Sequence, residues 1–130
     1  MGLFGFGKKN AAPKKTQESA PQLNPAEVLI QVESLRADAR GLKGKALADA
    51  LVEIGKRLDS IGELDQAIEA YEQSLEANHV MGKASTALVK LYNKKRAAAA
   101  ADKDDEAIKY YMDKVNEMLA LSKDQLRGRA

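Results

Sequence analysis

Few residues of this 130-residue chain are of the types that carry enzymatic or metal chemistry. The sequence has one histidine, His79, and no cysteine, and most carboxylates sit among lysines and arginines on expected outward helix faces. Catalysis needs several titratable groups that converge, and a transition-metal site needs several ligands together. The sequence therefore predicts that the protein is not an enzyme and holds no cofactor or metal, with His79 a residue of a helix junction.

An acidic run at 102–106 has the alternation that opens a calcium-binding loop, and Asp113 stands at the distance that would close one. Such a loop needs glycine at its sharp turn, where this chain has Ala107. The run is also followed by residues with a helical apolar pattern. We interpret it as the acidic start of a helix, where the helix dipole favours negative charge.

Residues 80–96 contain five basic side chains and no acidic one: Lys83, Lys90, Lys94, Lys95 and Arg96. As a binding surface, this segment would attract an acidic partner. As an ordinary solvated helix face it would bind nothing, and Asp49 and Asp59 on the preceding helix would dilute its field. The sequence leaves both interpretations open.

The first segment, residues 1–24, is rich in Gly, Pro, Ser, Gln and Lys without helical periodicity, so we expect a flexible tail. Its four lysines and one glutamate give a charge of +3. Of the chain's 21 basic and 19 acidic residues, 17 and 18 remain in residues 25–130, which gives −1. The expected folded part therefore lacks the cationic field that nucleic acid requires.

Near its start, the tail combines three apolar side chains with two lysines: Leu3, Phe4, Phe6, Lys8 and Lys9. Such a group could make weak, shallow contact with an anionic membrane surface or fill a pocket of a partner, or it could be an incidental apolar start. No apolar run approaches the roughly 18 residues of a membrane span. Together with the lack of cysteine and of a signal peptide, this predicts a cytoplasmic protein.

The remaining residues, 25–130, are predicted to form one all-α domain of five helices, because their apolar residues recur at spacings of three and four. The expected helices cover residues 25–40, about 45–61, 64 to at least 75, about 80–96, and near 104 to near 128. Asn24 is the expected cap of the first, with Pro25 in its first turn. Whether the alanine run at 97–101 extends the fourth helix is left open.

Two apolar pairs repeat at an interval of 34 residues, Ile54 with Leu88 and Leu58 with Tyr92. This is the period of the tetratricopeptide repeat. The first unit resembles that family through Leu51, Ile54, Gly55 and Leu58, followed by Ala67 and Tyr71. The second unit keeps Ala107 and Tyr111 but has Ser85 and Val89 in the other conserved positions and six more residues between its helices.

The resemblance implies a short right-handed solenoid of two helical hairpins, with the first helix as a capping helix. It also implies a non-catalytic adaptor or scaffold that binds a protein or peptide, here an acidic one, in a concave groove. The matching groove positions are Asp49, Val52, Lys56, Lys83, Thr86, Lys90, Asn93 and Lys94. The family's clamp for peptide carboxylates is not predicted, because Lys56 and Ala87 stand where it has asparagines.

Two units are few for such a stack, since about three are usually needed to bury a continuous core. The alternative function is therefore a structural protein that self-associates, as a homodimer, through its uncapped end. The expected core comprises Leu51, Ile54, Leu58, Ala67, Ile68, Tyr71, Leu75, Leu88, Tyr92, Ile108, Tyr111 and Val115.

Overall fold

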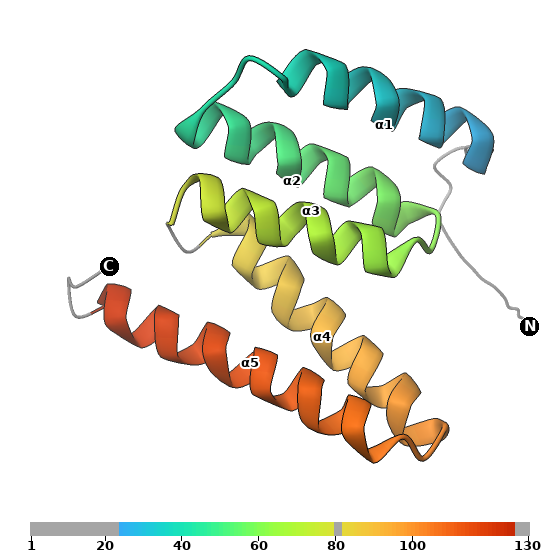
Figure 1. The fold of residues 1–130 in the computed structure, drawn as a ribbon, viewed down its shortest axis with the longest axis vertical. Coiled ribbons are helices and arrows are strands. Elements are labelled where there is room, and N and C mark those ends of the chain that lie inside the picture. Colours follow the sequence, from blue (N-terminus) through green and yellow to red (C-terminus); the bar gives the residue numbers. More distant parts are fainter. Residues whose placement is uncertain (1–23, 80–81, 127–130) are drawn as a thin grey trace, which may run out of the picture.

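The computed structural model describes residues 24–79 and 82–126, with side chains to residue 124, and within them it contains five α-helices and no strand. The helices are α1 (Pro25–Ala39), α2 (Gly44–Ser60), α3 (Leu64–Ala77), α4 (Lys83–Ala101) and α5 (Asp105–Leu126), as drawn in Figure 1. The all-α prediction is confirmed. The predicted tail, apart from Asn24, lies outside the described residues.

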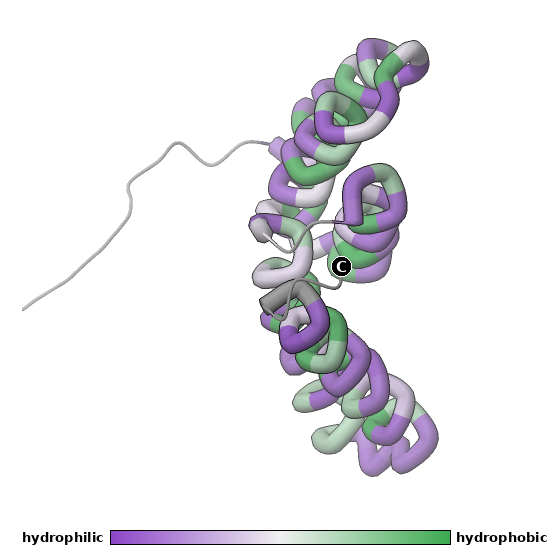
Figure 2. The backbone as a smooth tube through the Cα atoms, turned by 90° about the vertical axis from the view of Figure 1, so that its left-hand side faces the viewer, coloured by the Kyte–Doolittle hydropathy of each residue, from purple (hydrophilic) through white to green (hydrophobic). Residues whose placement is uncertain are grey.

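The helices lie in a row that follows the order of the chain. α1 packs against α2, α2 against α3, α3 against α4, and α4 against α5. Figure 1 shows successive helices running in alternating directions, with α1 and α5 at opposite ends. The side view of Figure 2 shows that the row is elongated rather than round. Each inner helix is therefore held by two neighbours and each end helix by one.

Local sequence explains where the first helices begin and end. Asn24 caps α1 as predicted: its Oδ1 accepts a hydrogen bond from the Ala26 amide at 2.8 Å. The short link between α2 and α3 turns through Gly62, whose φ of 79° is the left-handed conformation that glycine adopts without strain. So short a connection forces α2 and α3 to run antiparallel.

The fourth helix begins later than predicted, and its other end, which the sequence left open, lies at the end of the alanine run. It begins at Lys83 instead of Val80, because Gly82 acts as its cap: the Gly82 amide donates to Ser85 Oγ, which donates back to the Gly82 carbonyl, both at 2.9 Å. It also continues through the alanine run to Ala101, as expected from the high helix propensity of alanine.

The core runs along the inner faces of the row. Most of the expected core residues are buried: Ile54, Leu58, Ala67, Ile68, Tyr71, Leu75, Leu88 and Tyr92. The prediction is wrong for Leu51, Ile108, Tyr111 and Val115, which are only partly buried. Three of these lie on α5, and α5 packs closely on α4 alone. One neighbour cannot bury the whole apolar stripe of a helix.

α2 and α3 make a tight contact at Gly55. A Cβ atom added to Gly55 would lie 2.7 Å from Cζ of Tyr71, so the tyrosine ring lies directly on the glycine. One helical turn further along α3, the buried Ser74 hydroxyl donates to the Ala48 carbonyl of α2 at 2.8 Å. This hairpin positions one wall of the groove described next.

Candidate partner-binding surface

Two adjoining hollows lie between α2, α3 and the first half of α4. One, of about 490 Å³, is lined by Lys45, Ala48, Asp49, Val52, Glu53, Lys56, Ser74, Leu75, Asn78, Gly82, Lys83 and Ala84. The other, of about 630 Å³, is lined by Lys56, Asp59, Tyr71, Gly82, Lys83, Thr86, Ala87 and Lys90. Because Lys56 and Lys83 line both, the hollows form one surface, here named the α2–α4 groove.

Most of the predicted groove residues meet there. Those that line the α2–α4 groove are Asp49, Val52, Lys56, Lys83, Thr86 and Lys90. Val52 is buried and forms part of the floor, so it offers little surface to a partner. Asn93 instead lines a separate hollow between α4 and α5, and Lys94 lines neither hollow of the groove. The predicted tail contacts, Leu3, Phe4, Phe6, Lys8 and Lys9, lie outside the described residues.

The second hollow of the groove is lined by three lysines, Lys56, Lys83 and Lys90, and by one carboxylate, Asp59, so its net charge is positive. Lys45 pairs with Asp49 at 2.9 Å, which leaves little net charge at that end. Lys56, Lys83 and Lys90 are exposed, and no carboxylate of the described residues lies within ion-pair distance of them. Their charges therefore add across the two helices.

Tyr71 forms the apolar floor of the second hollow. Its ring is 3% exposed and rests on Gly55. Burial raises the pKa of the Tyr71 hydroxyl, and the nearby carboxylates of Asp59 and Glu53 raise it further. Tyr71 thus stays neutral at physiological pH, and the floor adds no negative charge to the groove.

Not every cation of α4 is available to a partner. Lys95 pairs with Asp65 of α3 at 2.9 Å, and its Nζ lies 6.0 Å from the centre of the Tyr111 ring on α5. It therefore helps to join three helices. Sequence analysis grouped Lys95 with the other basic residues of the helix, because an ion pair between residues 30 positions apart produces no local sequence pattern.

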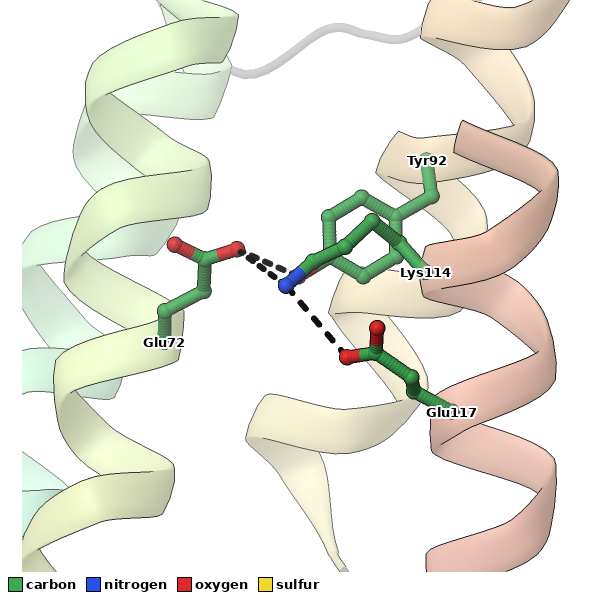
Figure 3. Close-up of polar contacts among 4 residues, drawn as sticks. All are labelled: Glu72, Tyr92, Lys114 and Glu117. Carbon is green, nitrogen blue, oxygen red and sulfur yellow. Dashed lines mark hydrogen bonds and ion pairs between the residues drawn. The ribbon is translucent and has the colours of Figure 1, made fainter. Parts of the chain in front are cut away.

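A second polar cluster fixes α5 and α4 to α3 (Figure 3). The Tyr92 hydroxyl donates to Glu72 Oε2 at 2.5 Å, and Lys114 Nζ lies 3.9 Å from the same oxygen and 3.5 Å from Glu117. Lys114 also lies over the Tyr92 ring at 5.9 Å. Burial raises the pKa of Tyr92 far above its ordinary value, and the hydrogen bond to Glu72 raises it further. Through this cluster, α4 and α5 both make polar contacts with Glu72 of α3.

The wall contributed by α3 was missed from the sequence. Ser74, Leu75 and Asn78 line the first hollow, although the predicted groove used only the second and fourth helices. One feature of the sequence could have indicated this wall: Ser74 is a polar residue on the apolar stripe that contains Tyr71 and Leu75. A polar side chain in such a position indicates a buried hydrogen bond or a cavity that it lines.

Two classes of site can be tested on the described residues. Within 24–79 and 82–126 there is no group of three or more His, Cys, Asp or Glu side chains placed to hold a metal ion. None of the helices in that part of the chain combines the length and apolar character that a bilayer span requires.

Comparison with known proteins does not add a relative. No family model matches the sequence, and no curated protein or solved structure matches it. The resemblance to the tetratricopeptide repeat stays a prediction from the residues quoted above.

Proposed function

We propose that the protein is a non-catalytic binding module of the cytoplasm that holds an acidic segment of a partner protein in the α2–α4 groove. We propose further that its helices form two tetratricopeptide-like hairpins, α2 with α3 and α4 with α5, stacked as a short right-handed solenoid with α1 as the cap. The observation that carries the proposal is the set of exposed lysines, Lys56, Lys83 and Lys90, around a hollow of about 630 Å³.

The packing pattern supports the repeat architecture. Helices pack closely with their neighbours along the chain, as in repeat proteins, where each unit contacts only the next. The small residue of the first unit, Gly55, is in tight contact with the large residue of the paired helix, Tyr71. This contact gives a physical reason for both residue types.

The chemistry of the groove supports an acidic partner. Three ammonium groups from two helices surround an apolar floor, so an extended peptide with carboxylates beside apolar side chains fits both features. Exposed charge pairs contribute only about 0.2–1 kcal/mol each. We therefore expect modest affinity with a strong dependence on salt.

A labelled octaglutamate peptide tests the charge preference directly. Fluorescence anisotropy should detect its binding at about 20 mM salt, and binding should weaken steeply by about 200 mM. Charge reversal of Lys56 and Lys90 to glutamate should weaken binding roughly 3- to 10-fold or more at low salt, because two attractive pairs become repulsive.

The matched control reverses two exposed lysines outside the groove, Lys103 and Lys123, and so makes the same change in net charge. If both double variants weaken binding equally, the peptide senses only the overall charge and the groove proposal fails. Proteins captured from the source cell by the wild type, but lost with the groove variant and kept with the control, would identify the natural partner.

A further inference from the structure

The Tyr71 hydroxyl is a polar group of the core that the described fold leaves without a partner. Tyr71 is 3% exposed, and its hydroxyl makes no hydrogen bond to another described residue. Tyrosine hydroxyls in the interior of proteins usually find a partner, because leaving them without one is unfavourable. The partner of this hydroxyl must therefore come from solvent or from a bound ligand.

The hydroxyl opens into the second hollow of the α2–α4 groove. Within the described part of the chain, Arg57 Nε is the one buried side-chain polar atom that lacks both a hydrogen bond and contact with solvent. The Tyr71 hydroxyl oxygen also lacks a hydrogen bond, so it must reach the molecular surface. Because Tyr71 lines the second hollow, its small exposed area lies there.

Gly55 leaves room for the hydroxyl end of the ring. A Cβ atom at position 55 would meet Cζ, Cε1 and Cε2 of Tyr71 at 2.7, 2.8 and 2.9 Å. These atoms are the carbon that bears the hydroxyl and its two neighbours in the ring. The tip of the ring therefore lies beside Gly55 on α2, and a larger residue at that position would displace it.

The charges around the hydroxyl favour an anionic ligand. Lys56, Lys83 and Lys90 line the same hollow, and the two lysines of α4 lie seven positions, or about 10 Å, apart. The hollow also contains one carboxylate, Asp59, which makes no hydrogen bond to Tyr71 and no ion pair with any of these lysines. Burial and the charge of Asp59 raise the pKa of the Tyr71 hydroxyl, so it keeps its proton and acts as a donor.

The second polar cluster shows how this fold holds a carboxylate (Figure 3). There the Tyr92 hydroxyl donates to Glu72 Oε2 at 2.5 Å, and Lys114 Nζ lies 3.9 Å from the same oxygen. A tyrosine hydroxyl and an ammonium group together bind one carboxylate. The second hollow presents the same two kinds of donor, and within the described residues no carboxylate accepts a hydrogen bond from its tyrosine.

We propose that the second hollow is a subsite for one side-chain carboxylate of the partner, which accepts a hydrogen bond from the Tyr71 hydroxyl among Lys56, Lys83 and Lys90. The inference rests on the proposed function and names the residue that anchors the acidic segment. The first hollow continues the groove past Lys56 and Lys83, so the partner chain has room to extend beyond the subsite. We therefore assign the carboxylate to an internal Glu or Asp residue of the partner and not to its chain end.

Tyr71→Phe removes the hydroxyl and keeps the ring. Binding of octaglutamate with an amidated C-terminus, which carries only side-chain carboxylates, should weaken roughly 5- to 20-fold, because a hydrogen bond to a charged group is lost. This ratio should be nearly the same at about 20 and 100 mM salt, whereas the effect of reversing Lys56 and Lys90 should shrink as salt screens exposed charges. Octaglutamate with a free C-terminus should give the same ratio.

Tyr92→Phe is the matched control, because it removes a hydroxyl that already has a partner. It should lower the urea midpoint by roughly 0.5–1 M, since Glu72 loses a donor, and leave peptide binding unchanged, since Tyr92 lines neither hollow of the groove. Tyr71→Phe should do the opposite. Its urea midpoint should equal or exceed that of the wild type, because the hydroxyl makes no hydrogen bond within the described fold.

The outcomes distinguish the subsite from the groove as a whole. Peptide binding that is weakened by reversal of Lys56 and Lys90 but unchanged by Tyr71→Phe would overturn the subsite and leave the proposed function standing. A lower urea midpoint for Tyr71→Phe would show that the hydroxyl has a partner within the chain, which would also overturn the subsite. So would an effect confined to the peptide with a free C-terminus. If the wild type binds neither peptide, both proposals fail.

Discussion

Replacing Gly55 with alanine should destabilise the protein although alanine is the better helix former. The new Cβ would lie 2.7 Å from Cζ, 2.8 Å from Cε1 and 2.9 Å from Cε2 of Tyr71. Carbon atoms in contact are separated by about 3.5 Å or more, so the ring must retreat by about 0.8 Å. Tyr71 is held in the core between α2 and α3, which leaves it little room to do so.

The expected cost follows from two opposing terms. Overpacking of a well-packed core costs typically about 1–3 kcal/mol. Replacing glycine with alanine within a helix stabilises the helix by about 1 kcal/mol. The difference is a net loss of about 0–2 kcal/mol, centred near 1 kcal/mol, in the free energy of unfolding, which lowers the urea midpoint by up to about 1 M.

Urea unfolding followed by far-ultraviolet circular dichroism measures this loss, since the chain is helical and lacks tryptophan. Gly41→Ala is the control, because nothing lies within 4 Å of its added Cβ and its φ is not left-handed. A Gly55→Ala midpoint at or above the wild-type value, with unchanged m, would refute the steric argument. Adding Tyr71→Leu should then recover part of the loss, because the two changes share one contact.

Three further predictions concern stability. Asn24→Ala should cost about 1 kcal/mol in thermal unfolding, because the Ala26 amide loses its acceptor, and a change below about 0.3 would show that the cap is dispensable. Ala98→Gly, at an exposed position of α4, should cost about 1 kcal/mol if the alanine run is helical, and nothing if it is not. The pKa of the Tyr92 hydroxyl is raised in the folded protein, whereas it is about 10 in the unfolded chain. The contribution of Tyr92 to the free energy of unfolding is therefore constant below about pH 10 and decreases as the pH rises above that value. Melting temperatures from pH 8 to 11 should decline less steeply for Tyr92→Phe, and equal slopes would contradict the assignment.

The sequence predicts those features of the fold that depend on neighbouring residues. Helical spacing located all five helices. The contact of Gly55 with Tyr71 was not predicted, although the resemblance of the first unit had singled out both residues. Features that depend on how distant helices cross were not predicted. The pairing of Lys95 with Asp65 and the wall that Ser74 adds to the groove belong to this class.

The partial burial of α5 also depends on contacts between helices, and so it was not predicted. Its apolar pattern resembles that of a buried helix, but burial depends on how many neighbours a helix has, and periodicity does not report that number.

The predicted groove residues include the charged residues Asp49, Lys56, Lys83 and Lys90, which line the groove. They omit Lys45, Glu53 and Asp59, which also line it, and include Lys94, which lines neither hollow.

The single-file order of the helices also determines how the molecule opens. α5 has one close neighbour and no fully buried residue among those described, so its amide hydrogens should exchange with solvent before those of α3, which is held on two sides. Opening of α5 leaves the contacts of α2 with α3 intact. A ligand in the α2–α4 groove should then slow exchange in α2 and leave exchange in α5 unchanged, because no residue of α5 lines the groove.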